Sequence, residues 1–238
     1  IDADGIVTAL DTSEEAGIPV ITVDMKPSSG TYVTYIGSDN YLGGELAAKW
    51  SAKNILTDKD APKIALLTNS SSSAATLRLQ GFKDAIAEAV PGAEIVAEET
   101  GATREEFMTT VENILTANPD LDMVFSYSAS GGLGAYDAIE GAGKEEQVSV
   151  VGFDASDEEQ TAIKDGGCYK ASIMQFPDKL GETCVEAVEK TLNGEKMDEE
   201  IGVEVGVYTA DGIVYAADLE KKKIAWRSGT GEMPVPFL

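Results

Sequence analysis

Short apolar runs alternate with longer amphipathic segments along most of the chain. The apolar runs predict six β-strands, at 19–23, 63–68, 94–97, 123–126, 149–153 and 170–174. The amphipathic segments predict six helices, at 42–55, 74–90, 104–117, 132–142, 156–165 and 178–192. In one of these helices Phe82, Ile86 and Val90 recur at i, i+4 and i+8, which forms an apolar stripe that packs on a sheet. Strands that alternate with helices in this way are typical of βαβ units, so we predict an α/β fold with parallel sheets.

Small polar residues gather directly after several of the predicted strands. They occupy 69–73 and 126–132, and elsewhere Asp154, Ala155 and Ser156 end a strand and offer caps to the helix that follows. The carboxyl edge of a parallel sheet is where ligands are commonly held. The sequence therefore predicts a binding site at this edge.

The last part of the chain has a different pattern. Runs at 203–208, 212–216 and 224–227 predict β-strands, with a turn at Asp211 and Gly212 between the first two. We interpret this region as a terminal hairpin followed by a tail.

Charge and composition exclude several function classes. The 238 residues include 18 basic and 42 acidic side chains and no histidine, which gives a formal net charge of −24. Such a surface repels phosphate backbones and anionic lipid headgroups, so we do not expect nucleic-acid binding. Without histidine, there is also no imidazole to bind a metal ion. A Ser-His-Asp triad and a Cys-His dyad are impossible without histidine. No apolar run approaches the roughly 18 residues that a membrane-spanning helix needs.

The two cysteines and the glycine-rich segment have simple structural interpretations. Cys168 falls in a strand-like run and Cys184 in a helix-like one, which favours two separate buried thiols over a disulfide. The segment 131–134 lacks the lysine and the glycine spacing of a phosphate loop, so packing at a helix start is the better interpretation.

Arg78 is a candidate ligand-binding residue because it lies in the first turns of a helix that follows a polar loop. Its planar guanidinium could hold two oxygens of a ligand, which lysine cannot do. A solvated arginine on the helix surface is the equal alternative.

Several motifs together resemble the periplasmic sugar-binding proteins of ABC transporters, especially the ribose-binding type. They run in order over residues 1 to about 205 and comprise Asp4 to Val7, Ala16 to Asp24, Ser38 to Gly44, Arg78 with Gly81 and Phe82, Val151 to Asp154, and Gln175 to Pro177. The resemblance implies a two-lobe α/β fold in which parallel sheets are flanked by helices and a hinge closes the lobes on a sugar. It also implies that the family's opening β-α-β-α portion is missing before Ile1, so that the first lobe is incomplete. The implied lobes are 1–38 with 176–205, and 39–175 with 206–238.

The resemblance also implies the ligand-binding residues. Carried over by position, the polar ligands of the sugar hydroxyls would be Asp24, Arg78, Asp154 and Gln175, with Ser38 serving either the hinge or the ligand. Carboxylates accept hydrogen bonds from hydroxyls, whereas arginine and glutamine donate them, so a polyol can be satisfied on all sides. Phe153 would present an apolar face to the sugar ring, or else pack in the core.

Four positions depart from the ribose-binding type. Met25 replaces an arginine, Ser128 and Ala129 replace an Asn-Asp pair, and Ala102 stands where an aromatic wall is expected. Ser128 remains a candidate ligand residue. We therefore expect a ligand that is bulkier or less polar than ribose, or a degenerate site.

The resulting functional hypothesis is a non-enzymatic solute-binding protein without cofactor. It would capture a monosaccharide or polyol outside the cytoplasm, in the periplasm or lipid-anchored at the membrane's outer face, and deliver it to an ABC permease. One alternative is the effector domain of a lactose-repressor-type transcription regulator, which a helix-turn-helix before Ile1 would reveal. Another is a sugar-modifying enzyme that uses Asp24 and Asp154 as acid and base.

Overall fold

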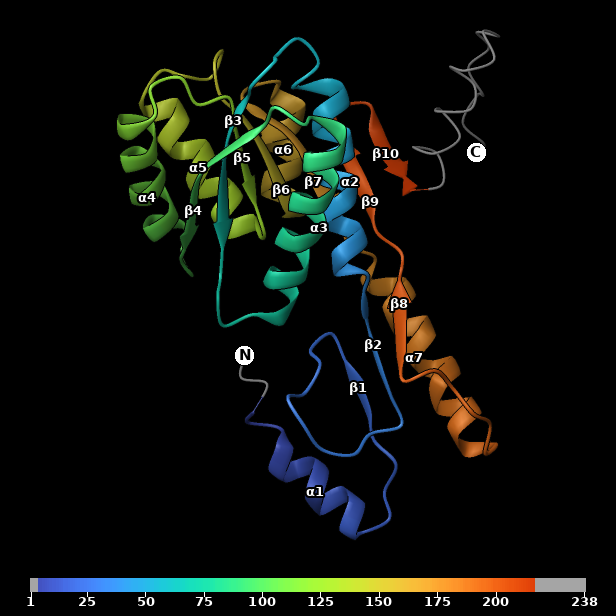
Figure 1. Cartoon of the computed structure of the whole chain (residues 1–238). Coiled ribbons are helices and arrows are strands. Elements are labelled where there is room, and N and C mark those ends of the chain that lie inside the picture. Colours follow the sequence, from blue (N-terminus) through green and yellow to red (C-terminus); the bar gives the residue numbers. More distant parts are fainter. Residues whose placement is uncertain (1–3, 217–238) are drawn as a thin grey trace, which may run out of the picture.

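The computed structural model describes residues 4–216 and arranges their strands in two sheets of unequal size (Figure 1). The larger sheet has seven strands in the order β10-β9-β7-β6-β5-β3-β4. β9 runs antiparallel to both of its neighbours, and the other strands are parallel to one another. Their bounds are β3 Lys63–Thr68, β4 Glu94–Thr100, β5 Met123–Ser126, β6 Ser149–Asp154, β7 Tyr169–Met174, β9 Gly206–Thr209 and β10 Gly212–Tyr215.

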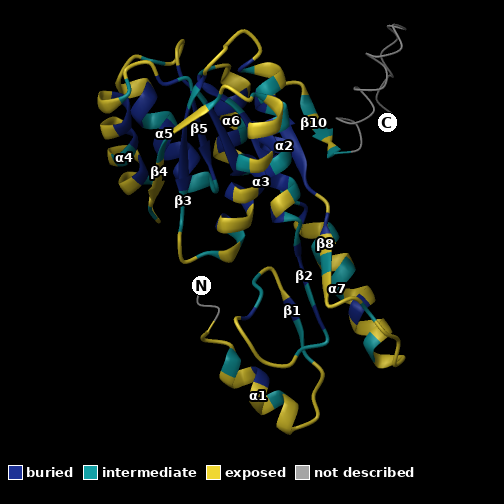
Figure 2. Cartoon of the chain, in the orientation of Figure 1, coloured by how far each residue is buried: buried dark blue, intermediate teal, exposed yellow. Residues whose placement is uncertain are grey.

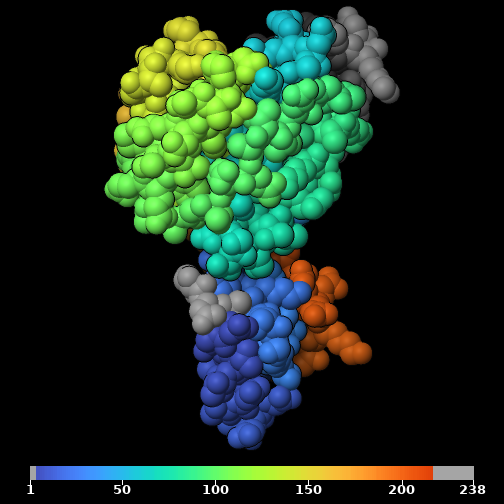
Figure 3. Space-filling model, turned by 60° about the vertical axis from the view of Figure 1, so that its left-hand side comes forward, coloured from blue at the N-terminus to red at the C-terminus, as the bar shows by residue number. Residues whose placement is uncertain are grey.

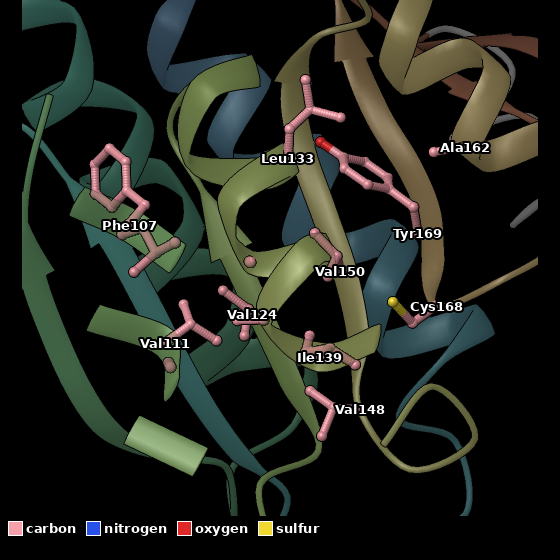
Figure 4. Packing of buried hydrophobic residues seen from close by; sticks show 14 of the residues in the cluster. Phe107, Val111, Val124, Leu133, Ile139, Val148, Val150, Ala162, Cys168 and Tyr169 are labelled. Carbon is pink, nitrogen blue, oxygen red and sulfur yellow. The ribbon is translucent and has the colours of Figure 1, made fainter. Parts of the chain in front are cut away.

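Helices cover both faces of the larger sheet, as in other parallel α/β folds. One face carries α2 (Asn40–Asn54) and α3 (Ser73–Ala89). The other carries α4 (Arg104–Ala117), α5 (Ala129–Gly141) and α6 (Asp157–Asp165). Figure 4 shows the second of these cores, in which Phe107 of α4 and Ile139 of α5 belong to the same buried cluster as Val124 of β5. Because the central strands are buried on both faces, most of the hydrophobic core lies in this part of the molecule (Figure 2).

The smaller sheet has three parallel strands in the order β1-β2-β8, with bounds Ile21–Val23, Thr34–Ser38 and Glu200–Val203. The helix α7 (Pro177–Leu192) packs against all three strands, whereas α1 (Val7–Glu15) buries only Leu10. Ile36, Ala187 and Val203 form a small buried cluster where α7 meets these strands. Figure 3 shows this part as a narrower body below the larger one.

The chain passes between the two sheets at three places. β2 leads into α2 at Ser38, β7 leads into α7 near Gln175, and β8 leads into β9 between Val203 and Gly206. These passages bring residues from distant parts of the sequence to the junction of the two bodies.

The structure confirms the α/β fold and nearly all of the strands and helices expected from the sequence. The prediction of one continuous strand over 203–208 is wrong. The chain leaves the smaller sheet after Val203 and joins the larger sheet at Gly206. β2 was not expected from the apolar pattern. The predicted hairpin is formed by β9 and β10, and the strand expected over 224–227 lies outside the described residues.

Cys168 and Cys184 are separate free thiols, as expected, but the expected burial holds only for Cys168. Cys168 precedes β7 and is buried, and burial raises its pKa to about 12. Cys184 lies on α7 and is partly exposed.

Candidate functional site

Two aspartates at strand ends mark the junction of the two bodies. Asp154 ends β6 in the larger sheet, and Asp24 directly follows β1 in the smaller sheet. Both have left-handed backbones, with φ values of 98° and 66° respectively. This conformation costs roughly 1–2 kcal/mol in a residue that carries a Cβ atom, and such strain is concentrated at functional sites.

Arg78 lies on the second turn of α3 and is 8% exposed. Its Nε donates to Asn40 Oδ1 at 2.8 Å and its Nη1 donates to the Tyr127 carbonyl oxygen at 2.7 Å. Nη1 also lies 3.6 Å from Asp154 Oδ1. The guanidinium stacks on the Phe153 ring, with its central carbon 3.6 Å from the ring centroid. The alternative of a solvated surface arginine is therefore wrong.

Burial lowers the pKa of Arg78, and the negative charges of Asp154 and Asp24 act in the opposite direction. The same group of charges acts on Tyr35. Burial and the charge of Asp24 raise the pKa of its phenol, whereas the charge of Arg78 lowers it. The Tyr35 hydroxyl donates to the Asp24 carbonyl oxygen at 3.1 Å, so a residue of β2 supports the strained backbone at Asp24.

Gln175 and Ser38 extend the cluster along the passages between the sheets. Gln175 Nε2 donates to Asp154 Oδ1 at 2.6 Å, and Ser38 Oγ donates to Gln175 Oε1 at 2.7 Å. The other oxygen of Asp154, Oδ2, accepts from the Ala129 backbone amide at 3.1 Å, at the start of α5. Asp154 thus accepts a hydrogen bond at each of its two carboxylate oxygens.

Ser128 caps α5, where its Oγ accepts from the Gly131 amide at 3.5 Å and lies 3.1 Å from Ser130 Oγ. Its hydroxyl is therefore engaged by the helix start beside Asp154. Phe153 is fully buried, so its ring offers no open face to a ligand in this structure and instead supports Arg78.

The structure thus brings the expected site residues together. Direct contacts link Ser38, Gln175, Asp154 and Arg78, and Phe153 stacks under Arg78. Asp24 acts on Arg78 through its charge, and Ser128 caps the helix that starts beside Asp154. Of the departing positions, Met25 is half-buried and Ala102 is exposed. Sequence reasoning missed Asn40, Tyr35 and Tyr127. Asn40 lies two residues after Ser38, and Tyr127 directly precedes Ser128, so their positions in the sequence could have suggested them. Tyr127 contacts Arg78 through its backbone carbonyl, however, and the side-chain type does not predict such a contact.

In the described part of the chain, neither a surface hollow nor a metal site adds to this cluster. A surface hollow of about 490 Å³ is lined by Thr100 and by residues of α4, none of which belongs to the cluster. Among residues 4–216, no three acidic or cysteine side chains are placed to hold a metal ion.

A family model described as a periplasmic binding protein domain matches residues 1–196. The chain belongs to the periplasmic binding protein family. The match covers both sheets up to the loop before β8, so the two-lobe α/β fold implied by the sequence motifs is confirmed.

Curated relatives and solved structures agree with this assignment. The ribose import binding protein of Salmonella typhimurium is 36% identical over 204 residues, which are 86% of this chain and 67% of that protein. The D-apiose import binding protein of Actinobacillus succinogenes is 34% identical over 201 residues, 83% of this chain and 64% of that protein. The chain therefore spans about two thirds of the length of these relatives.

A solved structure of an ABC transporter periplasmic solute-binding protein from Actinobacillus succinogenes, with bound D-allose, superposes with a TM-score of 0.79. It is 27% identical, and the superposition covers 88% of this chain and 76% of that one. These relatives are named as transport binding proteins. In the part of the chain that the structure describes, no helix is both long and apolar enough to cross a membrane.

Proposed function

We propose that this chain is a non-enzymatic solute-binding protein that captures a monosaccharide or related polyol and delivers it to an ABC permease outside the cytoplasm. The observation that carries the proposal is the cluster at the junction of the two sheets, in which Asp154 forms an ion pair with Arg78 and accepts a hydrogen bond from Gln175. Relatives named for ribose and D-apiose import support the sugar class.

The chemistry of the cluster suits a molecule with many hydroxyl groups. Asp154 and Asp24 accept hydrogen bonds from hydroxyls, and the free N–H groups of Arg78 and the amide of Gln175 donate to their lone pairs. A sugar hydroxyl that enters between Arg78 and Asp154 would meet a donor and an acceptor whose separation is now 3.6 Å. Phe153 contributes indirectly, because it holds the guanidinium plane in place.

The two sheets are the cores of the two proposed lobes, 1–38 with 176–205 and 39–175 with 206–238. Asp24 belongs to one lobe and Asp154 to the other, so a ligand that contacts both would stabilise a closed state over an open one. Ser38 and Gln175 lie on two of the three passages and link the hinge to the site through their mutual hydrogen bond.

The enzymatic alternative is weaker because of the surroundings of Asp154. Both oxygens of its carboxyl group already accept hydrogen bonds, from Gln175 and the Ala129 amide, and Arg78 lies 3.6 Å away, which suits a binding group better than an acid–base group.

The test is sugar binding by the chain and by two matched arginine variants. Thermal shift and calorimetry against pentoses, hexoses and polyols should identify a sugar that stabilises the protein. Arg78→Lys keeps the charge but loses the planar fork, so we expect binding to weaken at least about tenfold. Arg104→Lys is the control, since Arg104 pairs with Asp137 and Glu158 away from the site and its change should leave affinity unaltered. Absence of stabilisation by every sugar in the panel would overturn the proposal.

A further inference from the structure

A buried carboxylate lies behind the strained end of β6. Glu159 of α6 is fully buried, and its Oε1 accepts from Tyr169 Oη at 2.6 Å and from Ser172 Oγ at 2.9 Å. Its Oε2 accepts from the Ser156 amide at 2.7 Å, which completes the capping box of α6. Among residues 4–216 no lysine or arginine forms an ion pair with it.

Capping of α6 does not explain why this carboxylate is buried. The helix α4 has the same type of capping box, formed by Thr103 and Glu106, and there the glutamate is exposed. Burial of a charged group without a cation is unfavourable unless its hydrogen bonds compensate. The buried position of Glu159 therefore calls for a further role, which its partners indicate.

The partners of Glu159 lead to the backbone beside Asp154. Ser172 Oγ donates its proton to Glu159, and this leaves its lone pairs for the Ala155 amide, which donates to it at 3.0 Å. Ala155 and Asp154 are consecutive left-handed residues, with φ values of 50° and 98°. Two such residues in a row persist only where their surroundings hold them.

The Tyr169 hydroxyl fixes the same region from the strand side. A Cβ atom at Gly152 would lie 1.9 Å from Tyr169 Oη and 2.7 Å from Glu159 Oε1, so only glycine allows β6 to pass this close to the pair. The three side chains Glu159, Ser172 and Tyr169 thus form a rigid buried support under the end of β6. Figure 4 shows Tyr169 beside α5 in this region.

We propose that Glu159 is a positioning residue for Asp154, which acts through Ser172 and the Ala155 amide. Glu159 sets the direction of the Ser172 hydroxyl, and that hydroxyl holds the left-handed turn that points the Asp154 carboxylate at Arg78 and Gln175. Without this support the turn relaxes toward ordinary backbone angles and Asp154 leaves its donors. The inference deepens the proposed function and rests on it only in so far as Asp154 contacts the sugar.

The experiment combines a ligand-free measurement with a binding measurement on the same variants. Ser172→Ala removes the hydroxyl that links Glu159 to the Ala155 amide. Glu159→Gln replaces one carboxylate oxygen by an NH₂ group, which would face the hydrogen-bond donors that surround this side chain. Hydrogen exchange followed by NMR in the free protein reports the Ala155 amide, and backbone chemical shifts report φ at Asp154 and Ala155. Calorimetry with D-ribose and D-allose as probes reports affinity.

For both variants we expect the Ala155 amide to exchange about tenfold faster and sugar affinity to fall about tenfold. The chemical shifts of Asp154 and Ala155 should move, while those of Val124 in the core stay unchanged. Glu106→Gln is the matched control, because it alters the capping box of α4 and should change thermal stability without affecting Ala155 or binding.

Unchanged exchange and chemical shifts at Ala155 in Ser172→Ala would overturn the inference, as would unchanged affinity despite a relaxed turn. If the unaltered protein binds neither probe, that result bears on the choice of ligand and the proposed function. The ligand-free exchange and shifts then decide whether Glu159 holds the turn.

Discussion

Phe153 would act on the proposed sugar indirectly, through Arg78. Its ring is buried and lies 3.6 Å from the Arg78 guanidinium carbon, so the stacked pair restricts the position of the charge. We expect Phe153→Leu to lower the free energy of unfolding by about 1–3 kcal/mol. Sugar affinity should fall as well, because the Arg78 guanidinium would no longer be held in one position by the ring.

The control for this variant is Phe125→Leu, in the same core cluster. Phe125 is also fully buried and stacks on Phe82 with ring centroids 4.3 Å apart, but it carries no arginine. Urea unfolding and calorimetry should show lost stability in both variants and lost affinity only in Phe153→Leu. Equal affinity in the two variants would contradict the role of the ring.

Glu159 makes a prediction about pH. Burial raises its pKa above the usual value of 4.5, against the opposing effect of its hydrogen bonds from Tyr169, Ser156 and Ser172. The folded protein therefore binds this proton more tightly than the unfolded chain does. The contribution of Glu159 to stability is full below pH 4.5 and is lost as the pH rises through the raised folded pKa.

Glu159→Gln lacks this titration. Urea unfolding between about pH 4 and pH 7 should show that the stability of the unaltered protein, relative to the variant, declines as the pH rises. Parallel stability curves for the two proteins would mean that the pKa of Glu159 is not raised by folding.

At the residue scale, the sequence identified side chains better than it identified their partners. Asp154 lies at the end of a strand and Arg78 in the second turn of a helix, both near the carboxyl edge of the sheet, where ligand-binding residues are expected. The stacking of Arg78 on Phe153 and the support of Ala155 by Ser172 were not predictable. They depend on which strands become neighbours and on backbone angles that no side-chain pattern encodes.

The elements α2 and α3 meet at a distance that only glycine permits. A Cβ atom at Gly44 of α2 would lie 2.0 Å from the Arg78 carbonyl oxygen and 2.7 Å from the Phe82 amide nitrogen, both of which are backbone atoms of α3. Gly44→Ala must therefore push the helices apart and move Arg78. We expect a loss of about 1–3 kcal/mol in unfolding free energy and weaker sugar binding.

The matched control is Gly141→Ala at the end of α5, where an added Cβ atom meets nothing within 4 Å. Alanine favours a helix over glycine by up to about 1 kcal/mol, so this variant should be neutral or slightly stabilised. Urea unfolding measures both effects. A destabilisation of similar size in the two variants would show that backbone propensity, not the close contact, dominates at Gly44.

Element prediction succeeded where burial enforces a simple pattern. β3 and β5 have the bounds that their apolar runs indicated, because both strands lie in the middle of the larger sheet and are covered on both faces. β2 was missed since Thr34 and Ser38 interrupt the apolar pattern at its ends. The continuous run from Val203 to Tyr208 concealed a passage between two sheets, which depends on the arrangement of the whole chain.

At the scale of the whole molecule, the acidic surface acts as a filter on the ligand. The net charge of −24 repels anions, and the one cation of the site, Arg78, already faces Asp154 and feels the charge of Asp24. A neutral sugar has no net charge for this field to act on, whereas a sugar acid must approach against it. For the proposed site we therefore expect a preference for uncharged polyols over sugar acids.

The dependence of binding on salt tests this argument. Calorimetry at low salt and at about 0.3 M NaCl should give affinities for a neutral sugar that agree within about twofold, because screening over a Debye length of under 10 Å leaves a neutral ligand unaffected. The matching uronic acid should bind more weakly than the neutral sugar at low salt and should gain affinity as salt screens the surface. Tighter binding of the acid at low salt would mean that Arg78 is free to pair with a carboxylate, and that its neutralisation by Asp154 is lost when the ligand enters.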